Sequence, residues 1–435
     1  MIYFNKIVHW NELNLDEKKK ILSRPSVQKS FLVKETVQKI IKKVKILGDQ
    51  ALKEYTLLFD KCHINEFKLT KEQINASFLK INKDLKQSIL IAKKNITCFH
   101  QAQISSEVDI ETQFGVRCQQ INLPLNSIGI YIPSGTAPLF STVLMLGIPA
   151  VIAGCKKIIL CSPPPISEEV LYASYICGIN EIFQVGGAQA IAALAFGTQT
   201  IPKVDKIFGP GNSYVTEAKL QVSSIYNGPA IDMLAGPSEL LIIADNKSNP
   251  DFIAADLLSQ AEHGLSSQVI LLTPYINLAK KVIISINNQL INLSRLKEIT
   301  SSLKNSIIIV TDNITECINI SNIYAPEHLS IQTEQPRKIL DSILNASSVF
   351  LGSWSPETAG DYASGTNHVL PTYGKSVSSS CLGLADFQKR VLVQELTSQG
   401  LINLSHTLQI LSEAEKLEGH KNAVKIRVDS VKRNI

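Results

Sequence analysis

Between residue 128 and residue 210, short apolar runs alternate with segments of helical periodicity. The apolar runs occur in the segments I-G-I-Y-I-P, K-K-I-I-L-C-S, E-I-F-Q-V and V-D-K-I-F. The helices between them are predicted to begin near Pro138, Ser167, Gly187 and Asn212. Alternating strands and helices are typical of a parallel sheet with crossover helices, so this part of the chain is predicted to form an α/β domain.

A second alternating series begins at Leu240. Its predicted strands are L-L-I-I-A, Q-V-I-L-L-T, S-I-I-I-V-T, H-L-S-I-Q and S-V-F-L-G. We therefore expect two α/β domains, joined near Gly236 and Pro237. Residues 11 to about 110 are polar and lysine-rich with helical periodicity, and Gly48 is a plausible helix end. After about Leu384 we expect helices and no further strand, in a tail that docks on a neighbour.

The composition narrows the class of protein. The chain has 435 residues, of which 45% are hydrophobic and 19% charged, which is typical of a globular protein with two or three domains. Its net charge of +5 is scattered, without a basic block that carries aromatic residues, so a nucleic-acid partner is not expected. The eight cysteines form no C-x-x-C pair, and the first ten residues lack the features of a signal peptide. We expect a cytoplasmic protein with reduced thiols.

The stretch from Cys118 to Cys155 contains no charged residue and superficially resembles a membrane span. Prolines and glycines interrupt it at positions 124, 133, 135, 138, 147, 149 and 154. An uninterrupted apolar helix of about 20 residues does not fit there. Buried strands and a core helix have the same composition, so no membrane partner is predicted.

Candidate metal ligands lie in three separate segments. Asn249 and Pro250 are predicted to begin a helix that ends at Gly264, and Gln260 and His263 project from one face of it. Asp361 follows the predicted strand S-V-F-L-G and a glycine-containing loop, where ligand-binding residues of parallel sheets collect. A mixed set of nitrogen and oxygen ligands suits zinc. With a single carboxylate, the ion would retain positive charge and accept neutral nitrogen ligands from a substrate.

His420 lies in the tail, far from the predicted sheets. It becomes a ligand only if the tail reaches a site, on its own chain or on a partner.

Two further groups of residues indicate catalysis and nucleotide binding. In A-P-E-H-L, Glu327 could activate water and His328 could take and return a proton. Tyr131, Gln189 and Asn212 each lie just past a predicted strand, so they would gather at the carboxyl edge of one sheet. No G-x-G-x-x-G follows a predicted strand, and the expected nucleotide domain is an incomplete Rossmann-like one.

These segments together resemble the histidinol dehydrogenase family. Matching segments include V-G-G-A-Q-A-I-A-A-L-A-F-G-T, D-K-I-F-G-P-G-N, D-M-L-A-G-P-S-E, D-L-L-S-Q-A-E-H-G, G-T-N-H-V-L-P-T, G-L-A-D-F-Q-K-R and H-K-N-A-V. The resemblance covers most of the chain beyond about residue 24 in the family's order. It implies a zinc-dependent oxidoreductase that converts L-histidinol to L-histidine through histidinaldehyde, with two NAD, in the last steps of histidine biosynthesis.

The resemblance also implies an intertwined homodimer and specific site residues. Zinc would be held by Gln260, His263, Asp361 and His420, with His420 reaching across from the second subunit. NAD would contact Tyr131, Gln189 and Asn212. Histidinol would contact Ser238, Gln260, His263, His328, Asp361, His368, Glu415 and His420, and the catalytic pair would be Glu327 and His328.

The expected fold class is α/β, with two Rossmann-like parallel-sheet domains. Residues 1–25 would form a dimerisation segment, and residues 26–129 with 239–382 a discontinuous α/β domain that carries the metal and catalytic residues. Residues 130–238 would form the NAD-binding domain, and residues 383–435 a helical segment that reaches the partner.

Two other functions remain open at this point. A zinc hydrolase of small amides or esters would share the metal and the base but would need no nucleotide domain. A non-catalytic binding protein with a cleft between two α/β lobes would leave the metal ligands unexplained, and it would require export.

Overall fold

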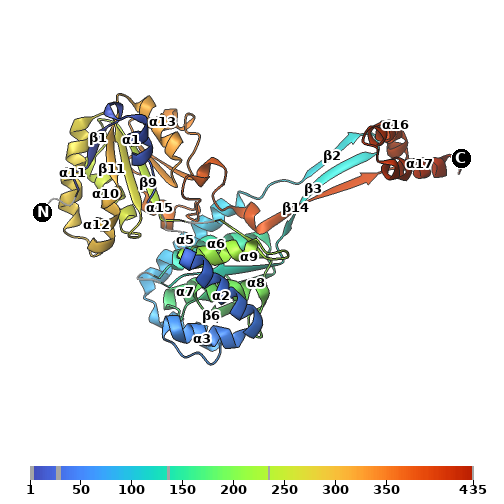
Figure 1. Ribbon diagram of the computed structural model, residues 1–435, viewed down its shortest axis with the longest axis horizontal. Helices are drawn as coiled ribbons and strands as arrows, with labels where there is room; N and C mark the ends of the chain where they lie inside the picture. The colour runs from blue at the N-terminus through green and yellow to red at the C-terminus, as the bar shows by residue number, and fades with distance from the viewer. Residues whose placement is uncertain (1–3, 26–30, 135–137, 234–235, 434–435) are drawn as a thin grey trace.

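The computed structural model describes residues 4–25, 31–134, 138–233 and 236–433. Two α/β units lie next to each other, and a long arm extends away from them with two helices at its tip (Figure 1). Each α/β unit contains one parallel sheet, and the arm contains an antiparallel sheet. The expected pair of parallel-sheet α/β domains is confirmed.

The first unit contains a five-stranded parallel sheet in the order β6-β5-β4-β7-β8. Its strands are β4 (Ser127–Tyr131), β5 (Lys157–Ser162), β6 (Glu181–Gln184), β7 (Lys206–Phe208) and β8 (Ala230–Ile231). The crossover helices are α6 (Phe140–Ala153), α7 (Glu168–Ile176), α8 (Gly187–Phe196) and α9 (Ser213–Ser223). The four predicted strands and the four predicted helix starts are confirmed. Local capping explains two of the starts, because Ser167 and Asn212 accept hydrogen bonds from the first-turn amides.

The second unit contains a six-stranded parallel sheet in the order β1-β11-β10-β9-β12-β13. Its strands are β1 (Ile7–His9), β9 (Glu239–Ala244), β10 (Gln268–Thr273), β11 (Ile307–Val310), β12 (His328–Gln332) and β13 (Ser348–Leu351). Side chains of α10 (Pro250–Ala261), α11 (Ile276–Leu290) and α12 (Leu296–Lys304) form the core on one face. Those of α13 (Ile314–Tyr324) and α14 (Pro336–Leu340) lie on the other. All five predicted strands of this unit are confirmed.

The arm corrects the expectation that no strand follows Leu384. Residues Gln388–Leu396 form β14, which pairs antiparallel with all nine residues of β3 (Val116–Pro124). Beyond β3 lies β2 (Val108–Gln113), and the arm ends in α16 (Ser398–Ala414) and α17 (Glu418–Arg433) (Figure 1). The segment has apolar residues at helix-compatible spacing, and only a partner strand distant in sequence makes it extended.

Packing also corrects the expected grouping of residues 26–129 with residues 239–382. The helices in this range are α2 (Phe31–Leu47), α3 (Asp49–Asp60), α4 (Lys71–Ser77) and α5 (Lys83–Gln101). Side chains of α2 share a core with α8 and α9, and those of α5 share one with α6. These helices therefore cover the five-stranded sheet, because their apolar faces are complementary to its crossover helices.

The start of the chain belongs to the six-stranded unit. β1 pairs with β11, and Phe4 and Trp10 are buried in the cores of that unit. The short helix α1 (Leu15–Ile21) follows. Residues 4–25 thus complete a sheet of their own chain, and the dimerisation role expected for residues 1–25 stays a prediction.

The uncharged stretch between Cys118 and Cys155 forms a buried strand and a buried core helix, as expected, but its first part lies in the antiparallel sheet of the arm and is only half-buried. It contains most of β3, all of β4 and the 14-residue helix α6. Among the described residues, no helix is both long and apolar enough to cross a membrane.

Gly209 brings β7 very close to β4. Its φ angle is +116°, and a Cβ atom there would lie 2.0 Å from the backbone oxygen of Tyr131. We therefore expect Gly209→Ala to lower the free energy of unfolding by at least about 3 kcal/mol, because both the left-handed φ and a backbone clash oppose a side chain. Denaturant unfolding measures this loss.

Gly178→Ala is the matched control. Gly178 also has a positive φ, +78°, but a Cβ atom there would meet nothing within 4 Å. This variant should lose only about 1–2 kcal/mol. Equal losses in the two variants would contradict the importance of the close approach at Gly209.

Candidate metal and catalytic site

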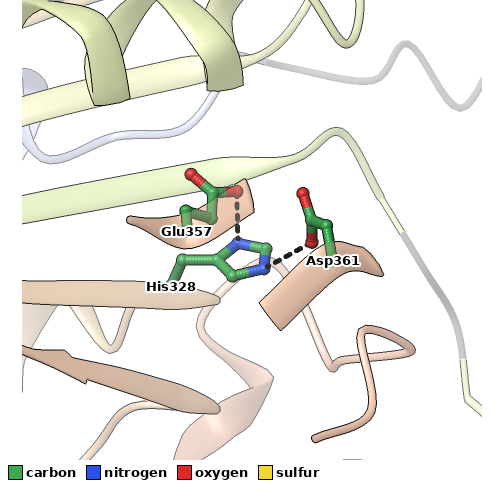
Figure 2. A group of neighbouring side chains, drawn as sticks. All are labelled: His328, Glu357 and Asp361. Atoms are coloured by element: carbon green, nitrogen blue, oxygen red, sulfur yellow. Dashed lines mark ion pairs between the residues drawn. The ribbon is translucent and has the colours of Figure 1, made fainter. Parts of the chain in front are cut away.

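The candidate site is built around His328, the first residue of β12. Its imidazole is 4% exposed and lies between the carboxylates of Glu357 and Asp361 (Figure 2). The His328 Nδ1 atom is 3.5 Å from a Glu357 oxygen, and Nε2 is 3.9 Å from a carboxylate oxygen of Asp361. Glu357 and Asp361 lie on one face of the short helix α15 (Glu357–Tyr362), because they are four residues apart.

The predicted ligands Gln260, His263 and Asp361 meet at this site. Gln260 lies in the last turn of α10 and is fully buried, with its Nε2 atom 3.2 Å from His328 Nδ1. The His263 Nε2 atom lies 4.0 Å from the second carboxylate oxygen of Asp361. The helix ends at Ala261 rather than at Gly264, so His263 lies in the turn that follows it. Gln260 therefore approaches His328, and His263 approaches Asp361 on the other side of the same imidazole.

The site forms at the amino edge of the six-stranded sheet. His328 is the first residue of β12 and Glu239 the first residue of β9, the neighbouring parallel strand. Asp361 follows β13 and a glycine-containing loop, as expected, but its carboxylate lies at the amino edge of the sheet, beside His328. α10 follows β9 as a crossover helix, so its last turn returns to the end of the sheet where β9 began. α15 folds back toward the same end after β13, as its ion pair with His328 requires.

Hydrogen bonds determine which nitrogen of His328 carries the proton. The Nδ1 atom lies 3.0 Å from the backbone oxygen of Glu239 and 3.5 Å from carboxylate oxygens of both Glu327 and Glu357. All three are acceptors, against the single donor offered by Gln260, so Nδ1 carries the proton. In the neutral imidazole the Nε2 atom then carries no proton and faces Asp361.

Burial and charge shift the titration of these groups. Burial raises the pKa of Glu327 and raises that of Glu357 well above its usual range. Burial alone would lower the pKa of His328, but the fields of Glu357, Glu327 and Asp361 outweigh it and raise the pKa to about 10. The pKa values of His263 and His368 are lowered, mainly by desolvation, so these imidazoles are neutral near pH 7.

The donor set fits a divalent cation such as zinc. The Oε1 atom of Gln260 and both carboxylate oxygens of Glu357 are buried and accept no hydrogen bond from the described residues. Neutral imidazole, carboxylate and amide oxygen are the ligand types that zinc accepts. A dication would also neutralise the excess of carboxylates and lower the pKa of His328, which would return it to the form needed for a base.

His368 links the site to the five-stranded unit. Its Nδ1 atom lies 2.8 Å from the backbone oxygen of Asp361, and its Nε2 atom lies 3.2 Å from the hydroxyl of Thr142 in the first turn of α6. α6 begins just after the carboxyl end of β4. The amino edge of one sheet therefore faces the carboxyl edge of the other.

The three predicted nucleotide contacts lie at that carboxyl edge. Tyr131 ends β4, and its hydroxyl accepts a hydrogen bond from the Gly187 amide at 3.1 Å. Gln189 lies in the first turn of α8, after β6, and Asn212 caps the start of α9, after β7. Their predicted convergence on one edge is confirmed, and their contacts with NAD stay a prediction.

Three other predicted residues form no hydrogen bond or ion pair with the cluster among the described residues. Ser238 is half-buried directly before β9. Glu415 and His420 are exposed at the tip of the arm, which extends away from both sheets (Figure 1). A single chain therefore does not bring His420 to Gln260, His263 and Asp361.

Glu357, Glu239 and Arg24 are site residues that the sequence reasoning missed. The spacing of Glu357 and Asp361 in P-E-T-A-G-D was an available signal for Glu357. No local pattern marks Arg24 or Glu239, which reach the site through contacts distant in sequence.

Known proteins identify the family of this chain. The histidinol dehydrogenase family model matches residues 22–428. The histidinol dehydrogenases of Buchnera aphidicola subsp. Schizaphis graminum and Escherichia coli K12 are 73% and 56% identical, over 100% and 99% of both chains. The histidinol dehydrogenase structure from Elizabethkingia anophelis matches with a TM-score of 0.95 and 45% identity, over 99% of both chains.

The chain belongs to the histidinol dehydrogenase family. It is accordingly an oxidoreductase, and the resemblance drawn from its segments is confirmed. The hydrolase and binding-protein alternatives are set aside. A probable aldehyde dehydrogenase from Listeria monocytogenes matches with a TM-score of 0.51 and 14% identity, which is a likeness of fold alone.

The Glu357 carboxylate is expected to set the titration of His328. In the metal-free protein, Glu357→Gln should lower the pKa of His328, because it removes the negative field that most strongly favours the imidazolium. Nuclear magnetic resonance of the labelled imidazole against pH measures this directly. Glu334→Gln, which neutralises an exposed carboxylate of the same unit, should leave the midpoint unchanged. An unchanged or higher midpoint in Glu357→Gln would contradict the assignment.

Proposed function

We propose that this chain oxidises L-histidinol to L-histidine through histidinaldehyde, with zinc and two molecules of NAD, in histidine biosynthesis. The observation that carries the proposal is the convergence of Gln260, His263 and Asp361 beside His328, in a chain matched along nearly its full length by the family. A cytoplasmic location is part of the proposal.

Gln260, His263 and Asp361 would hold zinc together with His420 of a second subunit. Bound zinc would orient the amino and imidazole nitrogens of histidinol and polarise its hydroxyl, while bound NAD would accept the hydride. Tyr131, Gln189 and Asn212 would contact NAD at the carboxyl edge that faces the site. Ser238, His368 and Glu415 complete the proposed substrate contacts.

His328 would act as the base in both oxidations. Its Nδ1–H is held by the Glu239 carbonyl, so Nε2 is free to take the alcohol proton and return it to water. Glu327 is 7% exposed, and its carboxylate is held by the Glu239 amide at 2.8 Å. It would activate the water that adds to the aldehyde. The hydrate formed in this way would then be oxidised with His328 again as the base.

A thiol route to the acid is disfavoured. Burial raises the pKa of Cys155 to about 11, so the thiol stays protonated near neutral pH. Cys118 is half-buried in β3, on the arm rather than beside His328.

The arm supports a homodimer in which each chain completes the site of the other. All six residues of β2 are exposed, among them Val108 and Ile110, and Leu392 of β14 is 73% exposed. Exposed apolar side chains of this kind favour a cover, and a second copy would supply one. The same association would carry His420 and Glu415 toward the partner's metal site.

The proposed roles of His328 and Glu327 predict that their substitution slows different oxidation steps. The wild-type protein should form two NADH per histidinol, followed by absorbance at 340 nm. His328→Asn should slow both oxidations by about 10²–10⁴-fold, because it removes the base, whereas Glu327→Gln should mainly slow oxidation of the aldehyde. Supplying histidinaldehyde directly separates the steps. If Glu327→Gln slows the two oxidations equally, Glu327 does not have the proposed role in activating water.

Shared sites predict that two inactive variants complement each other. His420→Ala should lose stoichiometric zinc, measured by metal analysis, and should be inactive. When His420→Ala and His328→Asn are unfolded together and refolded, half of the dimers are hybrids with one intact site, so about a quarter of wild-type activity should return. Each variant refolded alone is the control. Full zinc retention in His420→Ala would falsify the cross-subunit ligand.

A further inference from the structure

A single residue, Glu239, holds both members of the proposed catalytic pair through its backbone. Its amide donates to Glu327 at 2.8 Å, and its carbonyl oxygen lies 3.0 Å from the Nδ1 atom of His328. β9 and β12 are parallel neighbours with Leu240 opposite His328, so residue 239 lies beside the pair. The position of this peptide therefore sets both the orientation of Glu327 and the tautomer of His328.

The side chain of Glu239 is itself anchored. Its carboxylate is 4% exposed and accepts hydrogen bonds from Arg24 at 2.5 Å and 3.0 Å, in a two-pronged arrangement. The backbone amide of Tyr373 donates to the same carboxylate at 2.9 Å. Paired bonds between a guanidinium and a carboxylate fix orientation as well as distance. The start of β9 is thus held from both its backbone and its side chain.

Arg24 also holds the segment that leads into the catalytic pair. Its Nη2 atom donates to the backbone oxygens of Tyr324 at 2.6 Å and Ala325 at 3.2 Å, and the guanidinium lies 4.0 Å above the Tyr324 ring. Ala325 has a φ of +52°, a conformation that costs a residue with a side chain about 1–2 kcal/mol. Glu327 follows only two residues later, so Arg24 helps fix the turn from which Glu327 and His328 emerge.

We propose that Arg24 and Glu239 are positioning residues for the catalytic pair. This inference rests on the roles proposed above for Glu327 and His328. Neither residue needs to touch the substrate, because Glu239 acts through its peptide group and Arg24 acts through Glu239 and the carbonyls of residues 324 and 325. Residues of the chain's N-terminal segment thereby control the geometry of a site about 300 positions away in sequence.

The test uses Arg24→Gln in the full-length, zinc-loaded protein. A neutral amide cannot span the carboxylate and the two carbonyls, so kcat should fall about 10–100-fold in both oxidations as the pair loses its alignment. The KM for NAD and the zinc content should stay within twofold of wild type, because Arg24 contacts neither proposed binding region. Arg24→Lys keeps the positive charge but lacks the planar guanidinium that donates two parallel hydrogen bonds. Its kcat should therefore lie between those of wild type and Arg24→Gln.

A stability-matched control separates positioning from a general loss of structure. Val282→Ala removes two buried methyl groups from α11 in the same unit, away from His328, and should lower the unfolding midpoint without lowering kcat. If Arg24→Gln does not fold, kcat and the unfolding midpoint of Arg24→Lys are compared with those of Val282→Ala instead.

The outcomes distinguish this inference from the proposed function. A wild-type protein that forms no NADH from histidinol would reject the function itself. With an active wild type, a folded, zinc-loaded Arg24 variant whose kcat is within twofold of wild type would overturn the positioning role. A kcat loss equal to that of Val282→Ala at the same unfolding midpoint would also overturn it. The positioning role is supported if Arg24→Gln loses more kcat than Val282→Ala while its KM for NAD and its zinc content stay unchanged.

Discussion

The crowding of negative charge around one buried imidazole is the constraint on which the site depends. Glu239, Glu327, Glu357 and Asp361 all approach His328 or its peptide neighbours, and three of these side chains are less than 10% exposed. Carboxylates removed from water are costly unless cations or hydrogen bonds compensate them. Arg24 compensates Glu239, and a dication among Gln260, His263 and Asp361 would compensate much of the remainder. Charge balance thus connects the proposed metal to the protonation state of the catalytic base.

The arrangement of the two sheets determines where this charge can act. The six-stranded sheet presents its amino edge, with His328 and Glu239, to the carboxyl edge of the five-stranded sheet, where Tyr131, Gln189 and Asn212 lie. His368 spans the junction through Asp361 and Thr142. A substrate held at the first edge would face a nucleotide held at the second, which is the geometry that hydride transfer requires.

The same chain leaves the proposed site incomplete and provides a means of completing it. The arm carries Glu415 and His420 away from their own chain's site on a sheet whose outer strand is exposed throughout. The exposed apolar side chains of this sheet, such as Val108, Ile110 and Leu392, are unfavourable in water without a cover. Association of two chains would remove that cost and add the fourth proposed ligand at the same time.

Local sequence determined the elements that depend on local physical chemistry. Alternating apolar runs and capping residues such as Asn212 and Asn249 predicted the strands and helices of both sheets, because periodicity and first-turn hydrogen bonds involve only neighbouring residues. The family segments, which the chain carries in order, predicted Gln260, His263, Asp361 and His420 as zinc ligands and Glu327 and His328 as the catalytic pair. Only the tertiary structure decided that residues 388–396 are a strand, that α2 to α5 cover the five-stranded sheet, and that the site lies at an amino edge. It also decided that Glu239 and Glu357 lie against His328, and that Arg24 holds Glu239. These features arise from contacts between residues far apart in sequence. A local sequence pattern cannot predict them, because it contains no information on the free energy of such contacts.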